Sequence, residues 1–269
     1  MRTAAKGLGV TAVLVFTLFP VYFMVVTALN GDANAGSRTL FPTDWTLENF
    51  TYVIDEGGFG RYLTNSLIVA LGTVLAGALL ALLAAVAVAR FRFRFRTSVL
   101  VMVLVIQMVP VEALVIPLFI QARTLQILDS LIGLVVVYLA FSLPFAIWTL
   151  RGFVAAVPVE LEEAAYLDGA SWGRMFRSVL LPLVAPGLVA TSVFSFIVAW
   201  NEFVFALTFM SDDANYTVAV GLRRFFGQYS TDWGAVMAAS TLITIPVMVF
   251  FVIAQKRLTD GLVAGAVKG

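Results

Sequence analysis

The sequence predicts an all-α membrane protein whose single domain, residues 1–269, carries six transmembrane helices. Apolar residues make up 61% of the chain and charged residues only 12%, whereas about a quarter of the residues in a soluble domain are charged. The apolar residues gather in runs of roughly 20, the length that crosses the hydrocarbon core as a helix. One long amphipathic segment interrupts these runs, at residues 162–182.

The first expected span covers residues 8–29 and follows Arg2 and Lys6. It is longer than the apolar core of a typical signal peptide, so we expect it to be retained. A cleaved signal stays an alternative, because Ala33-Asn34-Ala35 has the small residues of a cleavage site. Residues 30–64 then form a polar connection.

Five further runs predict the remaining spans, and prolines interrupt several of them. Proline inside a span bends the helix and leaves backbone groups that neighbours or a cavity must satisfy. The prolines favour a bundle with a path through it, although simple packing bends would also use them. The spans are expected at 65–89, 99–121, 131–150, 186–209 and 234–255, with Pro110 and Pro117 in the third, Pro144 in the fourth and Pro246 in the sixth.

The distribution of Lys and Arg predicts the orientation of these spans. With the N-terminus inside, twelve of the 17 basic residues fall in the inner segments and five in the outer ones. Cytoplasmic loops carry such an excess, so both termini and the connection 151–185 are expected in the cytoplasm of a multi-pass cell-membrane protein. The alternating Arg and Phe of residues 90–96 indicate a basic loop at the cytoplasmic headgroups or, alternatively, a contact with a partner.

Composition excludes several classes of function. The chain has no cysteine and no histidine, which removes Ser-His-Asp triads, thiolate nucleophiles and Cys- or His-ligated metal sites. It lacks the G-x-x-x-x-G-K-[ST] sequence of a phosphate-binding P-loop. A net charge of +1 gives no indication of nucleic-acid binding. We therefore expect a non-catalytic protein that binds no metal or cofactor itself.

Two acidic residues fall inside expected spans, Glu112 and Glu202. At the rise of an α-helix they lie ~20 Å and ~22 Å from the inner ends of their spans. A carboxylate in lipid costs about 3 kcal/mol or more, so each should face a cavity or a partner. With Gln107 and Asn201 they could form the polar wall of a substrate path; hydrogen bonds between helices, or a place near the outer headgroups, are the alternatives.

The amphipathic segment predicts two short helices at the membrane surface. Pro158 suits the beginning of the first helix, and the glutamates that follow lie near the positive end of its dipole. Gly169 is expected to end this helix, because glycine adopts the left-handed cap without a Cβ clash. A second amphipathic helix follows, and Pro182 is expected to stop it.

The spacing within this segment resembles the EAA loop of inner-membrane permease subunits in binding-protein-dependent ABC importers. Glu163-Ala164-Ala165 is followed after three residues by Gly169, after nine more by Val179, where isoleucine is usual, and then by Leu181-Pro182. Three other stretches are similar to the carbohydrate-importing, MalG-like branch of that family. They are Trp200–Phe203, Thr217–Gly221 and Gly261–Gly269.

The resemblance implies a type I ABC importer permease fold and half of a translocation path for a sugar or oligosaccharide. It also implies three partners: a second homologous permease, a homodimeric ABC ATPase that binds ATP and Mg, and an extracytoplasmic solute-binding protein. The alternative is a self-sufficient proton-coupled carrier using Glu112 or Glu202, for which the sequence shows no inverted repeat. By resemblance, the ATPase-coupling residues are Glu162, Glu163, Ala164, Ala165, Asp168, Gly169, Leu181 and Pro182, and the tail contacts are Gly265, Lys268 and Gly269.

Overall fold

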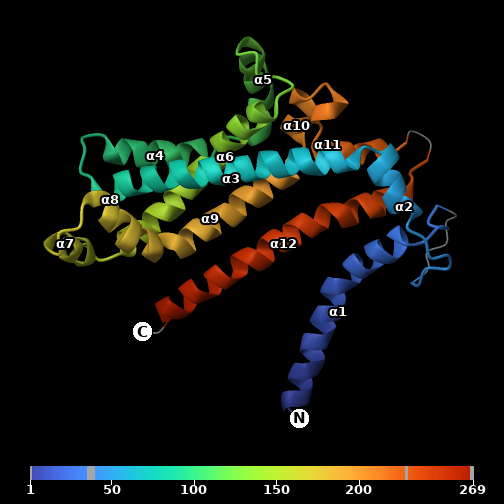
Figure 1. Cartoon of the computed structure of the whole chain (residues 1–269), viewed down its shortest axis with the longest axis horizontal. Helices are drawn as coiled ribbons and strands as arrows, with labels where there is room; N and C mark the ends of the chain where they lie inside the picture. Colours follow the sequence, from blue (N-terminus) through green and yellow to red (C-terminus); the bar gives the residue numbers. More distant parts are fainter. Residues whose placement is uncertain (1, 35–39, 228–229, 267–269) are drawn as a thin grey trace. The chain divides into compact units, whose positions relative to one another are not determined.

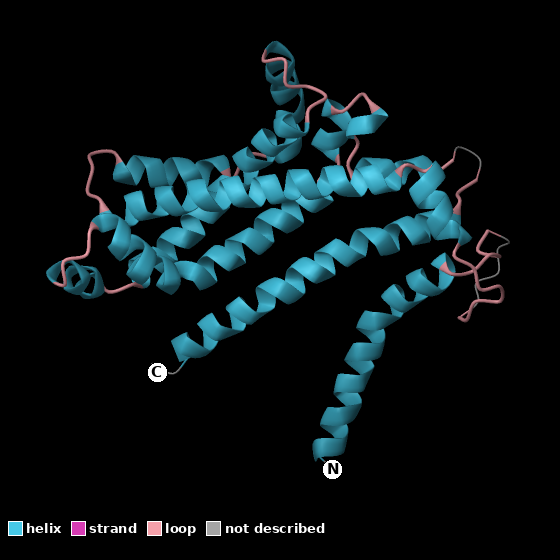
Figure 2. Ribbon diagram, viewed as in Figure 1, coloured by secondary structure: helices cyan, strands magenta, loops and turns pink. Residues whose placement is uncertain are grey.

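The computed structural model describes residues 2–34, 40–227 and 230–266, and the side chains of 6–34, 40–227 and 230–255. Within these residues the chain is helical and contains no strand (Figure 2), only isolated β-bridges. The helices, labelled in Figure 1 where there is room, are α1 (Arg2–Ala28), α2 (Glu48–Thr51), α3 (Phe59–Arg90), α4 (Arg96–Ile106), α5 (Val115–Thr124), α6 (Leu131–Ala156), α7 (Val159–Leu167), α8 (Trp172–Met175), α9 (Leu181–Asn201), α10 (Val204–Phe209), α11 (Val218–Leu222) and α12 (Trp233–Ala266).

The expected all-α membrane fold is confirmed. In the described part of the chain, five helical segments are long and apolar enough to cross a membrane, and a bent pair of helices gives a sixth. The five are Lys6–Ala28, Phe59–Arg90, Leu131–Ala156, Trp172–Asn201 and Trp233–Gln255, and the bent pair is Arg96–Ile106 with Val111–Thr124.

The region expected as one helix over 99–121 is two helices that meet at a bend of 96°. The helical path ends after Ile106 and resumes at the 3-10 turn Val111–Leu114, just after Pro110. Proline lacks an N–H and disfavours helical geometry at the residue before it, which explains the break. Pro117 lies in the first turn of α5, where proline is tolerated, and the helix continues through it to Thr124.

Pro182 does not stop the second helix of the amphipathic segment, contrary to expectation. The chain is helical without interruption from Trp172 to Asn201. A π-helical turn, Phe176–Leu180, precedes Pro182, and the Leu181 N–H bonds back to the Phe176 carbonyl. This wider turn shifts the bonding pattern, so that Pro182 falls in the first turn of α9. The fifth expected span also ends early, at Asn201, and α10 is separate from it.

The chain divides into two compact units, one formed by residues up to 64 with 217–247, and the other by 65–216 with 248 onward. In the second unit, α6 packs along α9 and along α4. Its buried core joins α3, α6 and the π-turn before α9, with Ala85, Leu150 and Leu180 almost fully buried. Val157 and Met175 extend this core to the connection that carries α7 and α8, which therefore rests on the bundle.

The first unit has an aromatic centre formed by Phe59, Tyr62 and Phe225. The ring centroid of Phe59 lies 6.0 Å from that of Tyr62 and 6.0 Å from that of Phe225. Gly221 in α11 lies directly against the ring of Tyr62, where a Cβ would overlap it. This close approach explains the glycine of the Thr217–Gly221 stretch.

Candidate functional site

The helix α7 begins and ends as the sequence predicts. Pro158 immediately precedes it, and Gly169 follows it with a φ of +80°. The Gly169 N–H donates to the Tyr166 carbonyl at 3.0 Å, and the Ala170 N–H donates to the Ala165 carbonyl at 2.9 Å. These two bonds form the Schellman cap, which requires the left-handed residue that glycine supplies.

The outer face of α7 combines exposed apolar side chains with carboxylates. Leu167 is 89% exposed and Tyr166 is nearly half exposed, as is Trp172 at the beginning of α8. Glu163 and Asp168 lie on the same open surface. In Figure 1, α7 and α8 lie at one end of the helices of their unit. An exposed apolar cluster of this kind, mixed with charge, marks a surface for interaction with a partner.

Glu162 faces the other way from Glu163. It is only 7% exposed, and its Oε1 accepts a hydrogen bond of 2.7 Å from the Arg90 Nε at the end of α3. The Arg90 Nη2 donates a second bond of 2.8 Å to the Val157 carbonyl. Glu162 therefore anchors α7 to the bundle and is buried, whereas Glu163, which the resemblance groups with it among the ATPase-coupling residues, is exposed. Sequence reasoning missed Arg90, because nothing in the alternating run singles it out.

A second polar cluster lies where α9 ends, at Glu202. Its Oε2 accepts from the Tyr138 hydroxyl of α6 at 2.7 Å and from the Ala206 N–H at 3.1 Å. Its Oε1 accepts from the Phe205 N–H at 2.9 Å. The carboxylate thus caps α10 and joins it to α6, which is the hydrogen-bonded contact between helices that the sequence left as one alternative.

The other residues expected in a path lie at the same kind of position. Gln107 follows the end of α4 and Glu112 lies in the 3-10 turn beyond the break, both exposed. Asn201 ends α9, exposed, and donates to the Ile197 carbonyl of its own helix. Both polar pairs therefore lie where a helix is interrupted.

The remaining residues of the expected ATPase-coupling and tail sets, as far as the structure describes them, take part in no polar cluster named above. Ala164 is exposed and Ala165 half-buried on α7, while Leu181 and Pro182 begin α9. Gly265 lies within α12, beyond the described side chains; Lys268 and Gly269 fall outside the described residues. In the described residues, no group of three His, Cys, Asp or Glu side chains could hold a metal ion.

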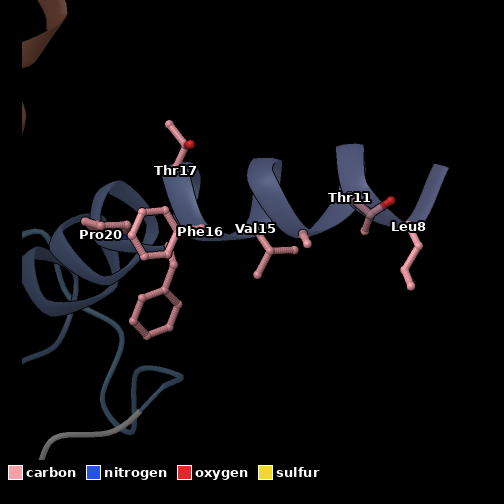
Figure 3. A pocket seen from close by; sticks show the side chains of 8 residues that line it. Leu8, Thr11, Val15, Phe16, Thr17 and Pro20 are labelled. Carbon is pink, nitrogen blue, oxygen red and sulfur yellow. The ribbon is translucent and has the colours of Figure 1, made fainter. Parts of the chain in front are cut away.

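A shallow hollow runs along α1, and residues of that helix alone line it (Figure 3). Leu8 and Phe16 are 76% and 83% exposed there. The lining is apolar apart from Thr11 and Thr17, so it suits lipid or an apolar neighbour and not a polar ligand.

Residues 68–263 match the model of a protein family described as "Binding-protein-dependent transport system inner membrane component". The chain belongs to this family. It is the permease subunit of an ABC importer, a membrane-spanning transport component and not an enzyme. The match begins inside α3 and ends inside α12, so it includes the whole connection with α7 and α8.

Curated relatives are similar over almost the full length of the permease. The diacetylchitobiose uptake system permease protein DasC of Streptomyces coelicolor is 44% identical, covering 97% of this chain and 96% of the relative. The trehalose transport system permease protein SugB of Mycobacterium tuberculosis is 37% identical, covering 96% and 95%. The trehalose/maltose transport system permease protein MalG of Thermococcus litoralis is also 37% identical, covering 97% and 95%.

Solved structures support the fold. A chain of a bacterial ABC transporter that imports the acidic polysaccharide alginate superposes with a TM-score of 0.78 at 20% identity, covering 95% of each chain. A chain of the MetNI methionine ABC transporter superposes with a TM-score of 0.60 at 16% identity, covering 80% of the permease and 98% of that chain. The similarity gives no support to a self-sufficient proton-coupled carrier.

Proposed function

We propose that this permease forms half of the translocation path of an ATP-driven importer for a di- or oligosaccharide. A second homologous permease supplies the other half, and a homodimeric cytosolic ATPase, which binds ATP and Mg, supplies the force. An extracytoplasmic solute-binding protein delivers the sugar. The permease acts as one domain over residues 1–269, with both termini and α7 in the cytoplasm.

The exposed face of α7 is the observation that carries this proposal. A helix that exposes Leu167 and Tyr166 beside Glu163 fits a groove in a partner protein, where apolar anchors bury and a carboxylate meets a cation. The chain contains no P-loop, so the energy must come from another chain. We propose that the ATPase transmits this energy to the bundle by contacting α7, which lies at one end of it. The tail residues Gly265, Lys268 and Gly269 are proposed as a second contact with the ATPase.

The two helix breaks support a path through the bundle. Backbone polar groups freed by a break at membrane depth are tolerated only where protein or water satisfies them. Gln107 and Glu112 flank one break and Asn201 and Glu202 the other. Broken helices line substrate routes in other transporters for this reason, so we assign the path to these two breaks.

The sugar assignment rests on the relatives. Three of the relatives that are similar over nearly the whole chain serve uptake of diacetylchitobiose, trehalose, or trehalose and maltose, as their names state. All three are disaccharides, so a neutral disaccharide or its oligomer is the expected class of substrate.

Purification in mild detergent, followed by mass spectrometry of the accompanying chains, tests the assembly. We expect a second permease and an ATPase. Glu163→Lys should lose the ATPase, whereas Glu56→Lys, the same change at an exposed residue of the connection after α1, should keep it. Equal ATPase recovery with both variants would remove α7 from the contact.

Uptake into vesicles tests the energy source and the substrate. Radiolabelled trehalose, maltose and diacetylchitobiose serve as probes, with ATP supplied on the ATPase side. We expect uptake of at least one probe that requires ATP and that vanadate inhibits. Uptake driven by a proton gradient without ATP would contradict the proposal.

Cysteine labelling tests the orientation cleanly, because the natural chain has no cysteine. With the ATPase stripped from the membranes, Leu167→Cys in α7 should react with a membrane-impermeant maleimide only in inside-out vesicles. Trp45→Cys, 70% exposed in the connection after α1, should react only in right-side-out vesicles. The reverse pattern would place α7 outside the cell.

A further inference from the structure

Arg90 differs from the other arginines of the run 90–96. Arg92 and Arg94 are exposed, and no ion pair is found for them with a described residue. The Arg90 side chain is only 14% exposed and points into the connection that carries α7. One arginine of an alternating series has therefore turned inward to become part of the bundle.

The guanidinium of Arg90 holds α7 at two points. Its Nη2 bonds to the carbonyl of Val157, just before α7 begins, and its Nε bonds to Glu162 in the middle of the helix. One anchor within the short helix and one at the end of α6, just before the helix begins, together restrain the direction of α7 as well as its position. The planar guanidinium can make both bonds at once, whereas a lysine ammonium has no such rigid fork.

The two bonds of Arg90 lie in buried surroundings, which restrict the movement of its side chain. The Glu162 side chain is 9% exposed, and Val157 belongs to the buried core that includes Val86 and Val154. Water has little access there, so loss of one partner leaves an uncompensated charge. Arg90 is also the last residue of α3, where a cation interacts favourably with the helix dipole.

We propose that Arg90 is a positioning residue that makes α7 and α3 move as one body, so that displacement of α7 enters the bundle through α3. This inference rests on the proposed function, in which the ATPase displaces α7. Without Arg90, α7 would still present its exposed face to the ATPase but would tilt on its own. ATP hydrolysis would then continue with less transport per ATP.

Distance measurement between two spin labels tests the rigidity. The absence of cysteine in the natural chain permits a label pair at Glu160→Cys on α7 and Leu79→Cys on α3, both exposed. The protein is purified with whatever chains accompany it and placed in lipid nanodiscs. We expect one narrow distance distribution with Arg90, a clearly broader one in Arg90→Gln, and an intermediate width in Arg90→Lys.

The matched controls separate this role from simple loss of charge. Arg92→Gln removes a neighbouring exposed arginine and should leave the distribution narrow. Glu162→Gln keeps an oxygen that accepts from Arg90 and should broaden it only slightly, whereas Glu162→Ala should broaden it clearly, although less than Arg90→Gln, because the bond to Val157 remains. Should Arg90→Gln accumulate poorly, Glu162→Ala tests the contact between Arg90 and α7, because the bond from Arg90 to Val157 is still in place.

Coupling supplies the second readout, as diacetylchitobiose, trehalose or maltose imported per ATP hydrolysed. In Arg90→Gln this ratio should fall about fivefold or more, the lower end of typical coupling between distant sites, while the ATPase still co-purifies. An unchanged ratio together with an unchanged label distribution would overturn the role of Arg90. Absence of any ATPase from the natural complex would instead overturn the proposed function, and the label distributions would still decide whether Arg90 fixes α7 on α3.

Discussion

The hydroxyl of Tyr138 in α6 donates a hydrogen bond of 2.7 Å to Glu202, at the break between α9 and α10. Tyr138 is fully buried, and the same carboxylate accepts from the N–H groups of Phe205 and Ala206. One carboxylate thus satisfies a buried hydroxyl and the beginning of a helix. The Glu202 carboxylate therefore stabilises the break in the fifth span and connects it to α6.

Removal of the Glu202 side chain should destabilise the break between α9 and α10 and its contact with α6. We expect Glu202→Ala to lower the free energy of unfolding by about 3 kcal/mol, because it deletes one interhelical bond and leaves two backbone donors without their acceptor. Tyr138→Phe should cost about 1 kcal/mol, since it removes only the interhelical bond. Unfolding in mixed micelles measures both changes.

The double variant and a neighbour supply the controls for Glu202. Tyr138→Phe with Glu202→Ala should cost less than the sum of the two single changes, because the two residues share a bond. Asn201→Ala, which removes only a bond to its own helix, should change the free energy by less than about 0.5 kcal/mol. Strict additivity would show that the Tyr138–Glu202 bond contributes nothing.

The sequence predicts the fold class and the coupling helix well, for local physical reasons. Apolar runs determine which segments can cross the membrane. The ends of α7 are local too: Pro158 and Gly169 act through their own backbones, and the structure places them at the two ends of that helix.

What the sequence cannot predict depends on contacts between distant residues or on backbone bonding around a proline. Pro110 is visible in the sequence, but the size of the bend there, 96°, is not. Pro182 reads as a helix end, and only the π-turn before it keeps the helix continuous. Glu162 and Glu163 look alike in the sequence, and the difference arises from Arg90, 72 residues away.

Gly221 should tolerate no side chain. A Cβ there would overlap the ring of Tyr62, which also accepts a hydrogen bond from Arg224 and packs on Phe59. Gly221→Ala should therefore lower the free energy of unfolding by about 1–3 kcal/mol, the usual cost of overpacking. Gly152→Ala in α6 is the matched control, because its Cβ would meet no atom within 4 Å, and it should be neutral or stabilise by up to about 1 kcal/mol. Equal behaviour of the two variants in thermal unfolding would contradict the close contact.

Different substitutions of Gly169 should distinguish effects on folding stability from effects on ATPase binding. Its φ of +80° disfavours other residues, but an added Cβ would meet nothing within 4 Å in this chain. Gly169→Ala and Gly169→Leu should each lower the free energy of unfolding by about 1–2 kcal/mol through backbone strain. Only the leucine should sharply reduce the ATPase recovered on purification, because its bulk would meet the partner. Gly169→Asn, which tolerates the left-handed conformation, should keep both properties. Full ATPase recovery with the leucine variant would argue against close approach of a partner at this residue.

Asp129 should hold the connection before α6 to the segment after α10. Its Oδ1 accepts from the N–H groups of Ser211 and Asp212, each at 3.2 Å, and from the Asn215 amide, and its own φ is +55°. Asp129→Ala should lower the free energy of unfolding by about 2–3 kcal/mol, because it removes the acceptor and places alanine in a left-handed conformation. Asp129→Asn keeps one oxygen acceptor and tolerates that conformation, so it should cost about 1 kcal/mol or less. Hydrogen exchange gives the local readout: the amides of Ser211 and Asp212 should exchange much faster in the alanine variant and only slightly faster in the asparagine variant. Equally slow exchange in both would show that these two amides are protected by something other than the Asp129 carboxylate.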